Sequence, residues 1–450
     1  MFLVGITFFD LLISIIYLSI ILALVNRAMT KMNFIGKKYF LPFIYFKFLC
    51  TILFVLLHSY IYKGGDTFLY FAGAKFILGQ LINNPENIFN IYFSDYNQIS
   101  NLLYDSNFIA HYFFRANDVF FMSKIISIFN FITGNNYLAS NILYSMLCSY
   151  GVWKLYETLC KLYPSIYKYF AVGVLFYPTI GIWGSGILKD PLTLAAVGLI
   201  FYGFYNISIG YKLIYSFFLI ILSFFLCFIL KPYILYTFVP IMLIWLQSKY
   251  RNRIKNIFLK IIITPLILII FFIGGFYFLK TVSEGAGKYS LDNVKSVAEG
   301  FHNWHTFLAE TRDQSGYSLG EVEYTPIGIL TKAPEAFFVT YFRPFIFTDV
   351  RNFATVFEAI QSFILLIVTI YVFFKVGLIN FFKNLYRNDE IKVFLLFAII
   401  FGIAVGITSY NFGALSRYKI PGLPFYTSFL AILFKVGYLD KKIPHEQIQT

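Results

Sequence analysis

Charged residues are scarce in this sequence. Asp, Glu, Lys and Arg make up 13% of the 450 residues, whereas hydrophobic residues make up 59%. A soluble globular domain carries roughly a quarter charged residues, so this composition excludes an ordinary soluble protein. The mean hydropathy of +0.72 agrees with that exclusion. We therefore expect an all-α, polytopic transmembrane protein.

Cysteine is scarce as well. The four cysteines fall in or beside apolar runs without the spacing of metal ligands; they are Cys50, Cys148, Cys160 and Cys227. We interpret them as small buried residues. A cleaved signal peptide is also unexpected, because the first five residues form no basic region and Asp10 interrupts the first apolar run.

Nucleotide-binding motifs are missing. The sequence contains no P-loop, no Rossmann fingerprint and no nucleophile elbow, and no predicted cytoplasmic segment is long enough for a nucleotide-binding domain. Chemistry driven by cytoplasmic ATP or nucleotide sugars is therefore disfavoured, and an activated donor that already lies in the membrane fits better. The net charge of +14 does not indicate nucleic acid, because the basic residues cluster in short loops between spans.

Long apolar runs dominate the sequence instead. Runs of about 17 to 25 residues predict about eleven membrane spans. The predicted ranges are 6–26, 40–62, 137–158, 169–185, 191–208, 213–230, 233–248, 258–279, 354–374, 393–409 and 421–436. The 57 Phe and 36 Tyr fit spans whose ends carry interfacial aromatic residues.

Basic residues at alternate ends of successive spans indicate the orientation. By the positive-inside rule, their face is cytoplasmic, which puts the amino terminus outside and the carboxyl terminus inside. The residues of this face are Arg27, Lys31, Lys37, Lys38, Lys161, Lys168, Lys212, Lys249, Arg251, Arg253, Lys255, Lys375, Lys383, Arg387, Lys392, Lys435, Lys441 and Lys442.

Two long segments are predicted on the external face. Residues 63–136 and 280–353 hold most of the acidic residues. The first contains two stretches, 67–81 and 112–133, typical of amphipathic helices in the interface plane. The second indicates a short folded cap, or a substrate loop that orders on binding. We expect a single membrane domain, residues 1–450, with these two external loop regions.

A carboxylate follows the second predicted span directly. The two glycines before Asp66 let the chain turn tightly, so this side chain is expected at the water–lipid boundary, within reach of a lipid-linked substrate. We hypothesise that Asp66 is a general base that accepts a proton from an acceptor hydroxyl. The alternative is that it caps a helix beginning near Thr67, since Asp is a favoured N-cap residue.

Basic residues also occur in short external connections, although the positive-inside rule predicts few basic residues there. Ionisable groups at a membrane boundary are costly, and they tend to be paired or functional. Because Arg and Lys bind phosphate, we expect these cations to gather near Asp66 around a phosphate or diphosphate. They are Lys189 next to Asp190, Lys231, Arg417 with Lys419, and Arg343 where the second external segment re-enters the membrane.

Each of these residues has a structural alternative. Asp190 before Pro191 has the form of a helix start, and the preceding lysine then merely pairs with it. Lys231 and Arg417 are long enough to snorkel to lipid headgroups. Arg343 either anchors a loop through an ion pair with a nearby carboxylate or binds phosphate, and the sequence does not rank these two roles.

The second external segment contains two histidines. His302 and His305, with the acidic residues that follow them, are residue types that bind metals. A zincin, however, requires two histidines four residues apart with a Glu between them, and the sequence lacks this pattern. We therefore predict no cofactor, and the sequence does not support a divalent metal. Trp304 between them is able to stack on a sugar, and Tyr70 and Tyr233 are further candidates for sugar or acceptor contacts.

These motifs resemble those of the GT-C class of integral-membrane glycosyltransferases, which use polyprenyl-phosphate-linked sugars and carry an acidic residue in the first large external loop. The matching residues are Gly65-Asp66-Thr67 with Tyr70, Leu188-Lys189-Asp190-Pro191-Leu192 at the start of a span, and Arg417-Tyr418-Lys419-Ile420-Pro421 with Pro424-Phe425. The front half, with Asn135-Asn136 before the next span, is also similar to EpsG-type and Wzy-type polysaccharide polymerases.

The resemblance implies a GT-C-like fold and an inverting transfer of a hexosyl or pentosyl unit from a polyprenyl-phosphate-linked donor to a glycan, lipid or protein acceptor. The transfer would serve cell-surface glycan synthesis at the outer face of a bacterial-type cytoplasmic (inner) membrane. Asp66 and Asp190 would be catalytic, and the cations would neutralise the departing phosphate.

Two alternatives remain open. A polymerase would join whole lipid-linked repeat units, whereas a flippase would move lipid-linked oligosaccharide across the membrane. A flippase needs charged groups deep inside several spans, and the sequence offers only Lys47 and Glu157, which are predicted near span ends.

Overall fold

The computed structural model describes residues 6–103, 116–251, 315–320, 322–323, 325–351 and 353–442, with single positions between 296 and 307. Within these ranges the regular structure is helical, and the only bridge of the β type is the isolated one between Gly316 and Asn411. The chain divides into two compact units, Met1–Trp153 with Ile180–Ala196, and Lys154–Thr179 with Val197–Thr450. We describe each unit by itself.

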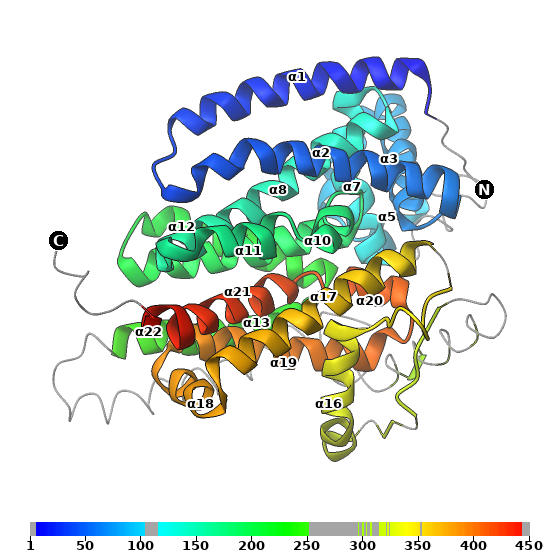
Figure 1. Cartoon of the computed structure of the whole chain (residues 1–450). Helices are drawn as coiled ribbons and strands as arrows, with labels where there is room; N and C mark the ends of the chain where they lie inside the picture. Colours follow the sequence, from blue (N-terminus) through cyan, green and yellow to red (C-terminus); the bar gives the residue numbers. More distant parts are fainter. Residues whose placement is uncertain are drawn as a thin grey trace. The chain divides into compact units, whose positions relative to one another are not determined.

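The first unit contains the amino-terminal helices of Figure 1. They are α1 (Phe8–Thr30), η1 (Ile35–Tyr39), α2 (Phe40–Leu56), η2 (Leu57–Tyr62), α3 (Asp66–Asn83), η3 (Pro85–Asn87), α4 (Ile88–Phe93), α5 (Tyr96–Leu103), α7 (Asn117–Thr133) and most of α8 (Tyr137–Leu162). The chain returns to this unit in α10 (Pro178–Trp183) and leaves it in α11 (Lys189–Ile209).

Helix α1 begins with a capping box. The Asp10 N–H donates to Thr7 Oγ1 at 3.2 Å, and the Thr7 N–H donates to the Asp10 carboxylate at 2.7 Å. Both bonds satisfy backbone donors that the start of a helix leaves open. The acidic residue that interrupts the first apolar run therefore caps an uninterrupted helix.

The first external segment folds into packed helices. Helix α3 covers the stretch 67–81 predicted as helical, and α7 covers 117–133 of the predicted stretch 112–133, whose residues 112–115 lie outside the described residues. The Asn130 side chain donates to the Phe71 carbonyl at 3.4 Å, and Phe120 shares a hydrophobic cluster with Ile77, so the two helices run antiparallel. Ile91 of α4, with Tyr96 and Ile99 of α5, completes this cluster. The two helices thus pack on each other around a small core of their own.

The second unit contains the carboxyl-terminal helices. After the end of α8 come η4 (Pro164–Ile166), α9 (Tyr167–Phe170), η5 (Ala171–Leu175), the start of α10 and most of α11. Then follow α12 (Leu213–Leu230), α13 (Pro232–Arg251), α16 (Pro326–Phe342), α17 (Phe353–Val376), α18 (Leu378–Arg387), α19 (Asp389–Ser409), α20 (Phe412–Tyr418), α21 (Leu423–Phe434), η8 (Lys435–Leu439) and α22 (Asp440–Lys442).

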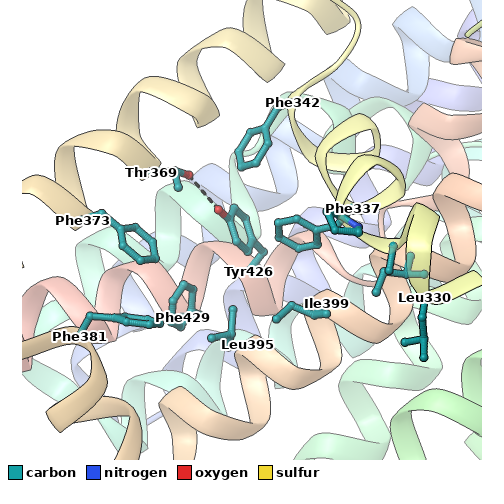
Figure 2. Close-up of a pocket in the computed structure, with 13 residues that line it drawn as sticks. Leu330, Phe337, Phe342, Thr369, Phe373, Phe381, Leu395, Ile399, Tyr426 and Phe429 are labelled. Carbon is teal, nitrogen blue, oxygen red and sulfur yellow. Dashed lines mark hydrogen bonds between the residues drawn. The ribbon is translucent and has the colours of Figure 1, made fainter. Parts of the chain in front are cut away.

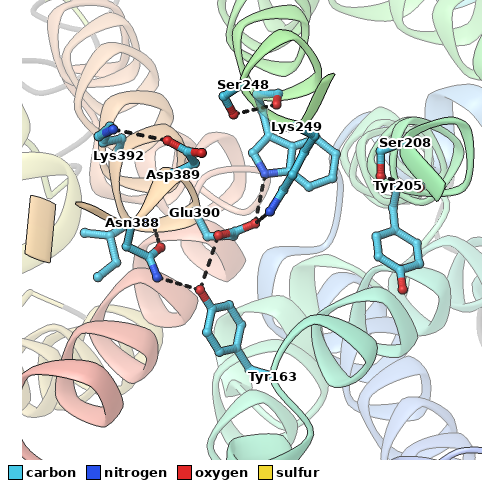
Figure 3. A network of polar contacts seen from close by, with 11 residues as sticks. Tyr163, Tyr205, Ser208, Ser248, Lys249, Asn388, Asp389, Glu390 and Lys392 are labelled. Atoms are coloured by element: carbon cyan, nitrogen blue, oxygen red, sulfur yellow. Dashed lines mark hydrogen bonds and ion pairs between the residues drawn. The ribbon is translucent and has the colours of Figure 1, made fainter. Parts of the chain in front are cut away.

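A buried carboxylate joins α19, α13 and the turn between α8 and η4 in the second unit (Figure 3). Glu390, in the first turn of α19, forms an ion pair with Lys249 of α13 and accepts hydrogen bonds from Trp245 Nε1 and the Tyr163 hydroxyl, both at 3.2 Å. Asn388 caps α19 and also donates to the Tyr163 hydroxyl at 2.7 Å. Lys249, predicted only as an orientation signal, thus also neutralises a buried charge.

Fewer helices than predicted satisfy the requirements of a membrane span. Six described helices are long and apolar enough, and α20 with the helix after it, bent by 65°, makes a seventh if counted as one span. The six are Phe8–Thr30, Ile35–Tyr62, Lys189–Ile209, Leu213–Leu230, Thr355–Val376 and Asp389–Ser409. The chain is therefore a helical protein with several candidate spans, and the prediction of about eleven is not confirmed.

The difference has physical reasons. The predicted span 169–185 is split among α9, η5 and α10, because an apolar run does not specify that one helix continues through it. Helix α8, which covers 137–158, carries Lys154, Glu157 and Lys161 in its second half, where both lysines pair with the glutamate. The predicted span 258–279 lies outside the described residues. All four cysteines are free and buried, which confirms that prediction.

Candidate functional site

Asp66 occupies the first position of helix α3. The helix is preceded by Lys63 in the left-handed conformation and by Gly65 at φ 116°, a conformation that favours glycine. Because Gly65 is the N-cap residue, the alternative in which Asp66 caps the helix does not hold. The half-buried carboxylate lies in the first turn, where a negative charge is favourable.

Lys189 is the centre of the polar site in the first unit. Its ammonium lies 2.6 Å from Asp118 Oδ2, with the two side chains 14% and 5% exposed. The same ammonium lies 5.7 Å from the centre of the Tyr70 ring, within the range of a cation–π contact. Tyr70 stands one helical turn after Asp66 on the same face of α3. Three helices, α3, α7 and α11, thus supply this site.

Asp190 lies directly beside this site at the start of α11. The helix begins at Lys189, so Asp190 and Pro191 form its first turn, as the predicted helix start requires. Asp190 is 2% exposed, and its carbonyl accepts a hydrogen bond from Thr193 at 3.0 Å. Lys189 takes Asp118 as its ion-pair partner, which the sequence analysis did not anticipate.

Lys231 is a buried cation in the second unit. It is the C-cap residue of α12, directly before α13, and it is 6% exposed. Its ammonium lies 4.3 Å from the centre of the Tyr418 ring. Arg417 lies 5.7 Å from the centre of the same ring, so two predicted phosphate ligands contact one aromatic side chain. Tyr233 stacks on Phe401 with 6.3 Å between ring centres.

Lys419 belongs to a buried polar network at the bend between α20 and α21. Its ammonium lies 3.7 Å from Glu358 Oε2, and both side chains are almost fully buried. The Thr179 hydroxyl lies 3.1 Å from the same carboxylate and 2.8 Å from Gln361 Oε1. A buried pair of this kind is costly unless its polar atoms are bonded, which this network provides.

Arg343 is bound to Asp349 by a bidentate ion pair. Its Nε and Nη2 donate to the two carboxylate oxygens at 2.8 and 2.6 Å, and the Phe345 N–H donates to the same carboxylate at 2.8 Å. Burial alone would raise the pKa of Asp349, but these hydrogen bonds outweigh it and hold the pKa below its usual value. Of the two predicted roles, this geometry favours the loop anchor over the phosphate ligand.

An apolar cavity of about 510 Å³ lies among the helices of the second unit (Figure 2). Its polar groups bond to each other, since the Thr369 and Tyr426 hydroxyls are 3.0 Å apart. A cavity of this size is typical of sites for small ligands. The other lining residues are Leu330, Ala333, Pro334, Phe337, Phe342, Phe373, Phe381, Leu395, Ile399, Ile403 and Phe429.

The structure brings only some of the predicted site residues together. Tyr70 contacts Lys189 in the first unit, and in the second unit Lys231 and Arg417 both contact the Tyr418 ring. The gathering of the second unit's cations around Asp66 stays a prediction. Trp304 and the two histidines lie outside the described residues. In the part of the chain that is described, no three His, Cys, Asp or Glu side chains form a candidate metal site.

Sequence reasoning missed two carboxylates. Asp118 lies in a stretch predicted only as an interfacial helix, and Glu358 lies in the first turns of a predicted span. The available signal was the same in both cases, namely one acidic residue in an otherwise apolar segment. Their partners are far away in sequence, so the pairing itself had no local signal.

Comparison with protein-family models, with curated proteins and with solved structures gives no match.

Proposed function

We propose that this protein is a membrane glycosyltransferase that moves a sugar from a polyprenyl-phosphate-linked donor to an acceptor. The observation that carries the proposal is the site of the first unit, where Lys189 contacts both Asp118 and Tyr70 one turn from Asp66. It supplies a half-buried carboxylate, an aromatic ring and a cation, which are groups suited to a hydroxyl acceptor and a sugar.

The carboxylates have different roles in this proposal. Asp118 is ion-paired with Lys189, and in this proposal it holds that ammonium in place. Asp66, half-buried at the start of its helix, is the carboxylate that we propose accepts the acceptor's proton. Asp190, buried in the first turn of α11, orients the residues beside it.

The second unit suits the lipid part of the substrate. Its apolar cavity accepts a hydrocarbon chain, since the two hydroxyls in its wall satisfy each other. Lys231 and Arg417, both over the Tyr418 ring, are the proposed ligands of the phosphate, with Lys419 behind them in its pair with Glu358. Such preorganised cations stabilise a leaving phosphate in the transition state.

One observation favours a second candidate, a flippase. Glu358 lies in a candidate span, and Lys47 is fully buried within another, so charged groups do occur inside spans. However, Lys47 donates to backbone carbonyls and Glu358 is held by Lys419 and Thr179, which gives both charges a structural role.

The test uses the purified chain in lipid nanodiscs and in vesicles, with synthetic prenyl-phosphate sugars as donors. A transferase releases prenyl phosphate when an acceptor is present and adds one sugar to it. A ladder of products would identify the polymerase instead. Movement of a fluorescent donor across the vesicle membrane without any release would identify the flippase and would overturn the proposal, as would a folded protein that releases nothing from any donor.

A further inference from the structure

A break between two helices lies directly before Lys189. Helix α10 ends at Trp183 and α11 begins at Lys189, and the five residues between them, 184–188, are all buried. Backbone groups in a buried, non-helical stretch need partners, and in a membrane protein they obtain them only from protein or enclosed water. The question is which side chains hold this break.

Helix α2 binds the first half of the break. Lys47, 1% exposed, donates to the Gly184 carbonyl and, at 3.5 Å, to the Gly181 carbonyl. The hydroxyl of Thr51, one turn further along α2, lies 2.8 Å from the Lys47 carbonyl and 3.3 Å from the Ser185 carbonyl, so its single hydrogen is shared between them. A cation is favourable at the carboxyl end of a helix, where carbonyls lack partners within the helix.

Helix α8 binds the second half. Asn141 Oδ1 accepts the Ile187 N–H at 2.9 Å, and the Tyr144 hydroxyl donates to the Leu188 carbonyl at 2.6 Å. The remaining residue is fixed by packing, because a Cβ on Gly186 would lie 2.0 Å from the Phe54 ring. Side chains of two helices therefore define the path of the chain up to Lys189.

We infer that Lys47 is a positioning residue for the pair of Lys189 and Asp118. The break is continuous with Lys189, whose ammonium must reach a buried carboxylate 2.6 Å away. Without the ammonium of Lys47, the Gly184 carbonyl loses its donor and the Gly181 carbonyl keeps only the Ser185 hydroxyl, so the break relaxes. This inference adds a role to the site of the proposed function, although Lys47 itself touches no substrate.

The test combines two measurements on Lys47→Met, hydrogen–deuterium exchange of the 184–190 backbone and the kcat and KM of donor turnover. We expect about tenfold faster exchange in that segment, from the loss of buried hydrogen bonds. We also expect kcat to fall about a hundredfold, with KM for the donor little changed, because misplacement of a catalytic group by about 1 Å has that effect.

Lys124→Met is the matched control. Lys124 is also a buried lysine of the first unit that donates to two carbonyls, those of Tyr92 and Ser94, at 3.2 and 2.9 Å. Its loss should speed exchange at 92–96 and leave 184–190 unchanged. Lys47→Gln keeps an N–H donor and should therefore give a smaller effect than Lys47→Met. If Lys47→Met does not fold, Lys47→Gln replaces it in both measurements.

The inference is overturned if a folded Lys47 variant keeps wild-type exchange at 184–190, or if exchange rises while kcat does not change. A wild-type protein that turns over no donor contradicts the proposed function. In that case the exchange measurement still decides whether Lys47 holds the break.

Discussion

The carboxylate of Asp349 shows how a single residue couples charge to folding. It binds Arg343 in a bidentate pair and accepts the Phe345 N–H, which keeps its pKa below the usual value despite burial. A carboxyl group whose pKa is lower in the folded than in the unfolded state stabilises the fold above its unfolded pKa, about 4. That stabilisation is lost as the pH falls through the folded pKa.

We therefore predict that Asp349→Asn lowers the free energy of unfolding by about 1–3 kcal/mol at neutral pH, because it leaves Arg343 without its charged acceptor. Below pH about 4 the difference from wild type should shrink. Thermal unfolding in detergent across this pH range measures both effects. Asp440→Asn is the control, since that exposed pair with Lys435 contributes little. A difference that does not depend on pH would contradict the assignment.

At the residue scale, the important residue types could be predicted from the sequence more reliably than the partners of those residues. Lys189 was recognised as costly at a boundary, and the structure places it in an ion pair. Its partner Asp118 could not be found, because 71 residues separate the two and periodicity carries no information on such pairs. The same holds for Glu358 and Lys419.

At the element scale, helix positions were predictable wherever apolar runs met turn residues. Helix α3 begins at Asp66, where the glycines predicted a turn, and Lys231 falls between α12 and α13 as expected. A connection between the predicted spans 169–185 and 191–208 was expected on the external face, but the burial of residues 184–188 was not. Its stability depends on Lys47 and Tyr144 of other helices, and a single apolar stretch does not reveal such support.

The helices around the apolar cavity give a second prediction. Ala333 of α16 lines the cavity, so Ala333→Trp should fill it and raise the KM for a prenyl-phosphate donor about tenfold, with kcat little changed. Ile327→Trp is the control on the same helix, because Ile327 is 76% exposed and does not line the cavity. The KM should also become insensitive to prenyl chain length. An unchanged KM in Ala333→Trp would exclude a lipid tail from this cavity.

At the scale of the whole molecule, composition predicted a helical membrane protein with several spans, and the structure agrees. The prediction of about eleven spans is not confirmed among the described residues, because hydropathy alone does not show that the 169–185 run breaks or that α8 carries an ion-pair cluster. The orientation, with the amino terminus outside, stays a prediction. It follows only from the distribution of basic residues.

The measurement that tests the account most directly is the rate of acceptor-dependent prenyl phosphate release by Asp66→Asn in nanodiscs. Removal of a general base typically lowers the rate about a hundredfold to ten-thousandfold, and we predict a loss in that range. Glu86→Gln, an exposed acidic residue of the same unit, should retain the wild-type rate. Full release by a folded Asp66→Asn protein would contradict the account.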